Sequence, residues 1–221
     1  MTDNRKSGIA LIAGSLGGIL TMAIHPVGMA SLTAADVAHL SAASAAAHSL
    51  AIVSVFLLFL GACGLQLYTA AADRLSFVAI VTYGFACVAA LIAATVSGFI
   101  IPGMMEHMIG DVPAAAHQWQ IVIDGTFQIN QCFARIFSVC ASAAIILWSV
   151  SALRNGGLGR GVAIYGCVIS LLTILGISVG HLRLDVHGMA VVALSQAIWF
   201  VIVGTQLLSR SATAVTPSTE A

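Results

Sequence analysis

The chain has 221 residues, of which 60% are apolar and only 7% are charged, and its mean hydropathy is +1.05. A soluble domain carries about a quarter charged residues, so this composition excludes an ordinary soluble domain and predicts an integral membrane protein surrounded by the lipid bilayer. The formal net charge is zero and no cluster of Lys and Arg occurs, which excludes nucleic acid as a partner.

Six apolar runs are long enough to cross about 30 Å of hydrocarbon at about 1.5 Å per residue. They cover Ile9 to Ala30, Ser49 to Ala72, Ser76 to Pro102, Gln128 to Leu153, Gly161 to Gly180, and Gly188 to Leu208. We therefore predict an all-α polytopic fold, with one domain of six transmembrane helices at 9–208 and outer loops at 31–48, 103–127 and 181–187. Residues 1–8 form a short N-terminus, and the polar, small residues at 209–221 predict a disordered tail. The first run is longer than the apolar core of a signal peptide, so we expect a retained helix.

Most positive charges fall on the side of the predicted bundle that holds both termini. Short loops rich in Lys and Arg stay in the cytoplasm, so we predict that the N-terminus and the C-terminus are cytoplasmic. The residues that carry this prediction are Arg5, Lys6, Arg74, Arg154, Arg160 and Arg210.

The first span carries a histidine near its outer end. Met22, His25 and Met29 share a helix face. Pro26 cannot donate a backbone hydrogen bond, so it predicts a kink in the helix. An ionisable side chain inside a span indicates a function by default, although a His bonded to a neighbouring helix is an equally good interpretation.

The first outer connection, residues 31–48, is rich in alanine. Thr33 is a possible cap with Asp36 three positions later, so we expect a separate helix lying at the membrane interface. Its polar side chains, among them His39, are expected to be solvated.

The stretch from Met104 to Arg135 is the longest interruption between apolar runs. Asp111 as a cap and Pro113 in the first turn predict that a helix starts there. Arg135 either binds an anionic headgroup or substrate, or extends its guanidinium outward to water. At about 100° per residue, one side of this helix carries a polar stripe made of His117, Asp124, Gln128, Gln131 and Arg135.

The sequence HLRLDVH connects the last two spans. His181, Arg183, Asp185 and His187 alternate with apolar residues, a pattern typical of an extended connection with one wet face. The four polar groups either converge on a site or form a short solvated loop with an Arg183–Asp185 pair.

Histidine and methionine gather in the outer half of the predicted bundle, which holds all seven histidines and every methionine except the first. Thioethers with imidazoles suit copper, above all Cu(I), whereas imidazoles alone suit zinc, iron or a haem. The sequence therefore predicts a metal or haem site on a histidine-rich outer face, with copper favoured. The candidate ligands are Met22, His25, Met29, Met105, Glu106, His107, His181 and His187.

Familiar catalytic and cofactor motifs do not occur in the sequence. It contains no HExxH, no CxxCH, no phosphate loop and no dinucleotide fingerprint. The five cysteines lie in apolar runs without CxxC spacing and are predicted to be small buried side chains.

Three other functions remain open at this stage. The polar stripe, with Gln196 in the sixth span, suits a small-solute or proton-coupled transporter. An accessory subunit or assembly factor in a larger membrane complex, or a homo-oligomer, needs no chemistry of its own. Three outer histidines with an aspartate would suit a metal-dependent membrane hydrolase.

Several short segments resemble a bacterial family of six-span integral membrane proteins of unknown function. The resemblance lies in AGSLGGIL in the first span, the end of the second span around Tyr68, GGLGRG before the fifth span, and the final WFVIVGTQLLSR. It implies the six-helix fold and a bacterial inner membrane. It implies no activity and no site residue.

Overall fold

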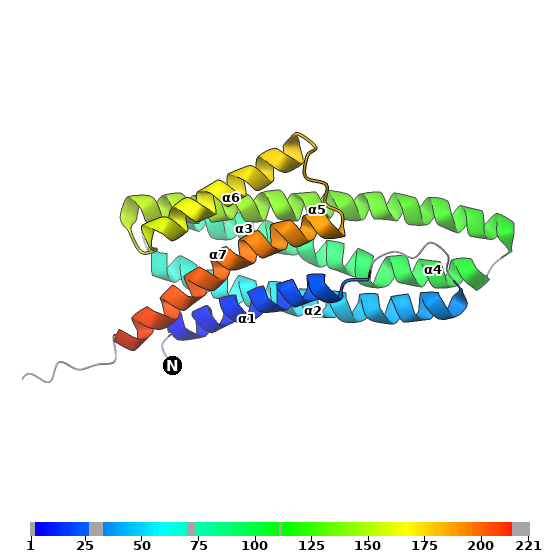
Figure 1. Ribbon diagram of the computed structural model, residues 1–221, viewed down its shortest axis with the longest axis horizontal. Helices are drawn as coiled ribbons and strands as arrows, with labels where there is room; N and C mark the ends of the chain where they lie inside the picture. Colours follow the sequence, from blue (N-terminus) through cyan, green and yellow to red (C-terminus); the bar gives the residue numbers. More distant parts are fainter. Residues whose placement is uncertain (1–2, 27–32, 70–73, 111, 214–221) are drawn as a thin grey trace, which may run out of the picture.

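The computed structural model describes residues 3–26, 33–69, 74–110 and 112–213, which form helices and no strand. Six segments are long and apolar enough to cross a membrane, and one of them combines α3, η1 and α4. The described residues therefore have the all-α architecture of a multi-pass membrane protein that the sequence predicts. The elements are α1 (Asp3–Ile24), α2 (Ala34–Thr69), α3 (Arg74–Thr95), the π-helix η1 (Val96–Ile100), α4 (Ile101–Gly110), α5 (Pro113–Asn155), α6 (Arg160–Ser178) and α7 (Val186–Thr213) (Figure 1).

Large apolar side chains cover the outside of these six segments. Leu67 is 79% exposed and Phe85 is 66% exposed. A groove between α2 and α3, lined only by apolar residues such as Phe56, belongs to the same surface. A soluble protein rarely exposes so much apolar area, so this surface suits contact with lipid. Cys132 is also exposed, contrary to the predicted burial of the cysteines.

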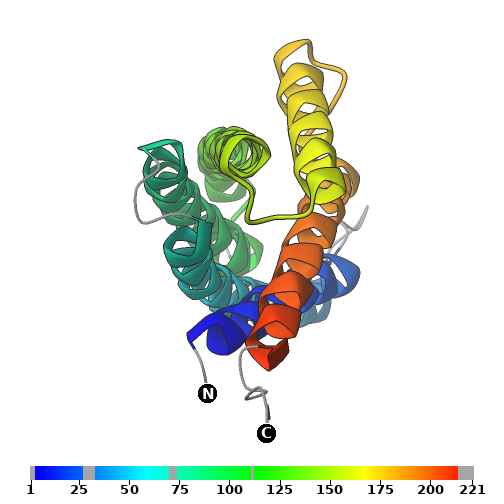
Figure 2. The same ribbon diagram turned by 90° about the vertical axis from the view of Figure 1, so that its left-hand side faces the viewer.

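The first helix begins and the last helix ends at the same end of the bundle, here called the terminal end (Figures 1 and 2). The sequence predicts that a disordered tail begins at residue 209, but α7 continues to Thr213. Residues 214–221 lie outside the described part of the chain. Five basic residues lie in helix ends at the terminal end, namely Arg5, Lys6, Arg74, Arg154 and Arg160. The predicted cytoplasmic placement of the termini rests on this grouping.

The predicted outer loop 31–48 is mostly helix. Its start is capped as predicted, because the Thr33 amide donates to Asp36 Oδ2 (2.9 Å) and the Asp36 amide donates to Thr33 Oγ1 (3.3 Å). The prediction of a separate interfacial helix is wrong. Alanine has the highest helix propensity, and no Gly or Pro interrupts this run, so α2 continues unbroken into the span.

The predicted outer loop 103–127 is also replaced by helices. The third span continues through η1 into α4, and α5 begins at Pro113 with Val112 as its N-cap. The predicted cap, Asp111, lies outside the described residues. At about 1.5 Å per residue α5 is about 65 Å long, roughly twice the thickness of a bilayer core. We call α4, residues 34–48 of α2 and residues 113–134 of α5 the helical extension, since they lie toward the end of the bundle opposite the terminal end (Figure 1).

The first span ends at a point where the sequence predicts a kink. Helix α1 stops at Ile24, so His25 and Pro26 lie just past its end. Proline disfavours a helical conformation in the residue before it, and His25 is that residue. Met29 lies outside the described residues.

The connection between α6 and α7 is short and not helical. Leu184 is buried in a small cluster with Ala134 and Val192. Asp185 Oδ1 accepts a hydrogen bond from the Gly188 amide (2.9 Å) and so caps the start of α7. His181, Arg183 and Asp185 of this connection are exposed, and so is His187 in the first turn of α7.

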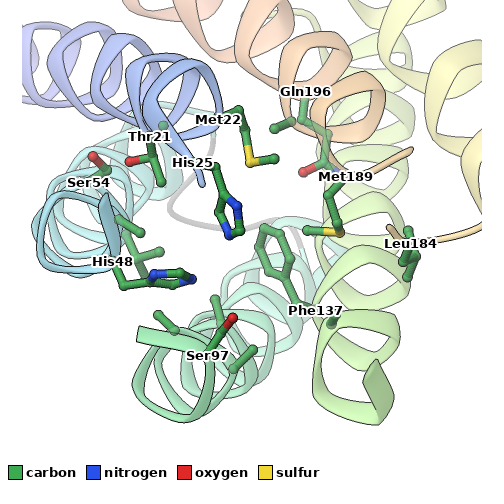
Figure 3. Close-up of a pocket in the computed structure, with 18 of the residues that line it drawn as sticks. Thr21, Met22, His25, His48, Ser54, Ser97, Phe137, Leu184, Met189 and Gln196 are labelled. Atoms are coloured by element: carbon green, nitrogen blue, oxygen red, sulfur yellow. The ribbon is translucent and has the colours of Figure 1, made fainter. Parts of the chain in front are cut away.

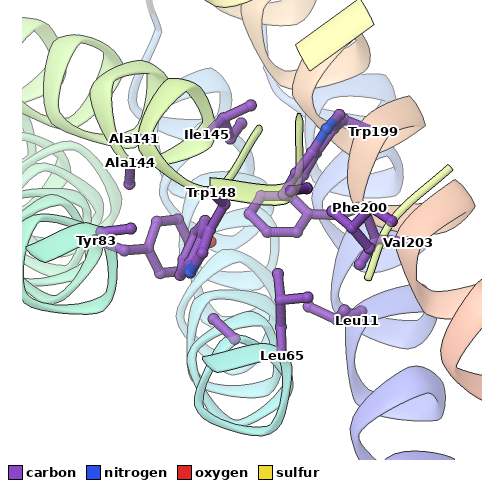
Figure 4. Close-up of a cluster of buried hydrophobic side chains, with 14 of the residues drawn as sticks. Leu11, Leu65, Tyr83, Ala141, Ala144, Ile145, Trp148, Trp199, Phe200 and Val203 are labelled. Atoms are coloured by element: carbon purple, nitrogen blue, oxygen red, sulfur yellow. The ribbon is translucent and has the colours of Figure 1, made fainter. Parts of the chain in front are cut away.

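Aromatic rings fill the centre of the bundle in the half nearer the terminal end (Figure 4). The rings of Trp148 on α5 and Trp199 on α7 are fully buried and stack with centroids 6.2 Å apart. Tyr83 of α3 and Phe200 of α7 lie beside them with centroids 5.4 Å apart. Helices α5 and α7 therefore meet through long side chains rather than through close backbones.

The other side of the bundle depends on glycine. A Cβ atom on Gly204 of α7 would lie 2.9 Å from the Gly8 carbonyl oxygen of α1, and a Cβ atom on Gly14 would lie 2.8 Å from the Ser54 carbonyl oxygen of α2. Small residues of this kind let membrane helices approach closely, so α1 packs tightly against both neighbours.

Gly204→Ala should lower the free energy of unfolding by about 1–3 kcal/mol, because the added methyl overpacks the α1–α7 contact. The matched control is Gly161→Ala, since a Cβ at Gly161 meets no atom within 4 Å and alanine favours a helix. Unfolding midpoints in detergent, followed by tryptophan fluorescence, measure both. Equal midpoints for the two variants would contradict this helix contact.

Candidate functional site in the central cavity

A cavity of about 330 Å³ lies among α1, α2, α3, η1, α5 and α7, and we call it the central cavity (Figure 3). Tyr83 and Phe200 belong both to its lining and to the aromatic cluster, so the cavity begins where that cluster ends. Most of the lining is apolar. Its polar or ionisable residues are Ser15, Thr21, His25, His48, Ser54, Ser97, Asn130, Gln131, Asp185 and Gln196.

The residues around the polar end of the cavity lie at similar distances from the terminal end. Counted along their helices from the terminal end, His25, His48 and Arg135 are each about 20 residues, or about 30 Å, away. This distance matches the thickness of the hydrocarbon core. The site therefore lies about the length of one membrane span from the terminal end, at the base of the helical extension.

His48 is buried between α2 and the π-helix, with only 6% of its surface exposed. A Cβ atom on Gly98 would lie 2.4 Å from the His48 Cβ, so only glycine at position 98 allows this approach. The His48 Nδ1 lies 2.8 Å from the Ser44 carbonyl oxygen. Ser44 Oγ donates to the Ser97 carbonyl oxygen (3.1 Å), which ties α2 to η1 beside the imidazole. π-Helical turns are common at functional sites.

His25 approaches His48 from the end of α1. The two ring centroids are 5.0 Å apart with 71° between the ring planes, and the tips of the rings converge on the same part of the cavity (Figure 3). The His25 Nδ1 lies 3.0 Å from the Pro26 carbonyl oxygen. A carbonyl oxygen can only accept, so Nδ1 is the donor in both histidines and each neutral ring carries a free lone pair on Nε2.

Two thioethers complete this end of the cavity. The side chains of Met22 and Met189 point into the space beside His25 (Figure 3). Ser138 Oγ lies 3.7 Å from the Met189 sulfur. The site thus combines two imidazoles with two soft sulfur atoms in an otherwise apolar surrounding.

The structure places the other predicted ligands elsewhere. His107 stacks on Trp119 in the helical extension, with centroids 5.7 Å apart, and Met105 and Glu106 share its helix α4. The lining of the central cavity includes neither these three residues nor the exposed His181 and His187. Of the predicted ligands that the structure describes, which leaves out Met29, only Met22 and His25 line the cavity.

The polar stripe lies on α5 as predicted, but most of it faces away from the cavity. His117, Asp124, Gln128 and Arg135 are exposed, and Gln131 alone lines the cavity. The Gln120 amide donates to Asp124 Oδ1 (2.8 Å) on the exposed surface of the same helix. The buried polar residue of this part of α5 is instead Asn130, next to the stripe.

His48 and Met189 are absent from the ligand set predicted from the sequence. His48 falls in a segment interpreted as a loop, and the unbroken alanine-rich run was the signal that it lies on a helix. Met189 lies in the cavity because of the way α7 is aligned along α5, and the sequence carries no signal for that alignment.

These features define the class of the protein: a multi-pass helical membrane protein with a central cavity that carries paired imidazoles. No protein-family model, no curated protein and no solved structure matches the chain. The chemistry of the cavity is therefore the basis for any statement about function.

His25 and His48 should both be protonated on Nδ1 and unprotonated on Nε2 when neutral, because both Nδ1 atoms face carbonyl oxygens. Solid-state NMR of protein labelled with nitrogen-15 histidine, in mildly alkaline buffer, distinguishes the two tautomers. His25→Gln and His48→Gln each remove one set of signals and so assign them. A proton on Nε2 in either neutral ring would show that the hydrogen bonds are wrongly assigned.

Proposed function

We propose that this protein binds a single Cu(I) ion in its central cavity, with His25, His48 and Met22 as ligands and Met189 beside them. The site lies on the outer side of a bacterial inner membrane, given the predicted cytoplasmic placement of both termini. The proposal keeps the metal chemistry expected from the sequence and changes the ligand set.

The distance between the two imidazoles carries the proposal. An imidazole nitrogen binds a metal at about 2.0 Å, and two rings at a tetrahedral angle on one ion have centroids about 5 Å apart. The observed separation is 5.0 Å. Both Nε2 lone pairs are free, and both Nδ1 atoms face backbone carbonyls, which is the support that orients metal-binding histidines in proteins.

The donor set favours Cu(I) over zinc and iron. Among the described residues, no three His, Cys, Asp or Glu side chains gather closely enough to hold a metal ion, so nitrogen, oxygen and thiolate donors alone do not complete a site. Thioethers select Cu(I) among the biological metals. A haem has less support, because axial imidazoles lie on opposite faces of the macrocycle and not 5.0 Å apart at an angle.

Binding has more support than conduction. The aromatic cluster of Trp148, Trp199, Tyr83 and Phe200 fills the bundle below the cavity, so a transported solute would have to displace it. A metal-dependent hydrolase has little support, since hydrolytic zinc sites use three protein ligands of the kind that the described residues do not bring together. An accessory role in a larger complex is compatible with copper binding.

Purified protein should bind about one Cu(I) per chain, measured by competition with a chromophoric Cu(I) chelator under reducing conditions. Loss of an orienting hydrogen bond weakens metal sites about 10- to 100-fold, so loss of a ligand in His25→Ala or His48→Ala should weaken binding by at least that factor. Met22→Leu keeps the side-chain volume and removes the sulfur, and should also weaken binding.

His107→Ala and the exposed His117→Ala are the matched controls, and both should bind Cu(I) like the unchanged protein. Elemental analysis of the same samples tests zinc and iron. A stoichiometry near zero, or equal losses in the His48 and His107 variants, would overturn the proposal.

A further inference from the structure

A metal ion would leave most of the central cavity empty. The cavity measures about 330 Å³, within the lower range of pockets that hold small organic ligands. It extends from the histidine pair down to Phe200 and Leu58, and apart from Met22 and Met189 the residues between these ends are not used by the proposed copper site.

Two buried polar atoms along this cavity have no hydrogen-bond partner. They are Oδ1 of Asn130, whose residue is 7% exposed, and Oγ of Ser15, whose residue is 1% exposed. Both residues line the cavity, from α5 and α1. An unpaired buried polar group costs about 1–3 kcal/mol, so a ligand that supplies a donor to Asn130 removes a real penalty.

The rest of the wall suits an apolar molecular body. Helix α3 contributes the small side chains Ala90, Ala93 and Ala94, and a Cβ atom added to Gly18 of α1 would meet no atom within 4 Å. Phe137 and Phe200 provide ring surfaces. The wall therefore leaves a space flanked by aromatic rings and lined by methyl groups.

Charge further limits the ligand. Among the described residues that line the cavity, Asp185 is the only carboxylate and there is no Lys or Arg. Asp185 would repel an anionic ligand, and among the described lining residues only the two histidines of the copper site could balance one. The ligand is therefore neutral.

We infer that the central cavity also binds a small, neutral, amphipathic molecule, with an apolar ring-sized body against α3 and the phenylalanines and a hydroxyl donor directed to Asn130 Oδ1. This site uses different residues from the copper site and does not depend on copper. It would give the protein a second, lipid-soluble ligand.

The test uses copper-free protein in lipid nanodiscs, with para-trifluoromethylphenol as the probe and its methyl ether as the matched probe without a donor. Fluorine NMR separates molecules bound in the cavity from molecules dissolved in lipid. The phenol should bind saturably at about one per chain and at least about 10-fold more tightly than the ether, since a hydrogen bond to a buried acceptor is lost.

Asn130→Leu should abolish the preference for the phenol over the ether, and the exposed Gln128→Leu on the same helix should keep it. His25→Ala should keep it too, which separates this inference from the copper proposal. Equal binding of the two probes to the unchanged protein, or only unsaturable partition into lipid, would overturn the inference even if Asn130→Leu fails to fold.

Discussion

The separation between α5 and α7 sets the shape of the whole bundle. Trp148 and Trp199 keep these helices apart, with ring centroids 6.2 Å from each other. Near the terminal end the rings fill the resulting gap. Farther along the same helices, the small residues Ala134, Ala193 and Ala197 line the central cavity together with Phe137, Met189 and Gln196. The same two helices therefore contribute to both the aromatic cluster and the central cavity.

The histidine pair depends on backbone groups more than on side chains. The Pro26 and Ser44 carbonyl oxygens hold the two Nδ1 atoms, and the missing side chain of Gly98 makes room for His48. The π-helical turn leaves the Ser97 carbonyl available to Ser44. The Ser44 carbonyl belongs to α2, so the His48 ring is oriented by a helix before any ligand arrives.

Hydropathy was enough to predict the number and order of the spans, because each needs about 20 apolar residues. Hydropathy could not show that α2 and α5 continue far beyond that length, because a solvent-exposed helix and a loop have similar polarity. His25 was found because it stands out in an apolar run. His48 and Asn130 were not, because their importance depends on which helix faces which, and the period of a helix does not specify its neighbour. The predicted polar stripe lay about one residue away from the buried face.

The length of α2 has a mechanical consequence. This helix carries His48 and continues into the helical extension, without a Gly or Pro in its extension part. His25 lies just past the end of α1, which stops at Ile24. The position of His48 is therefore tied to the helical extension, because both belong to one continuous helix. The separation of the two imidazoles depends on how α2 sits against the end of α1.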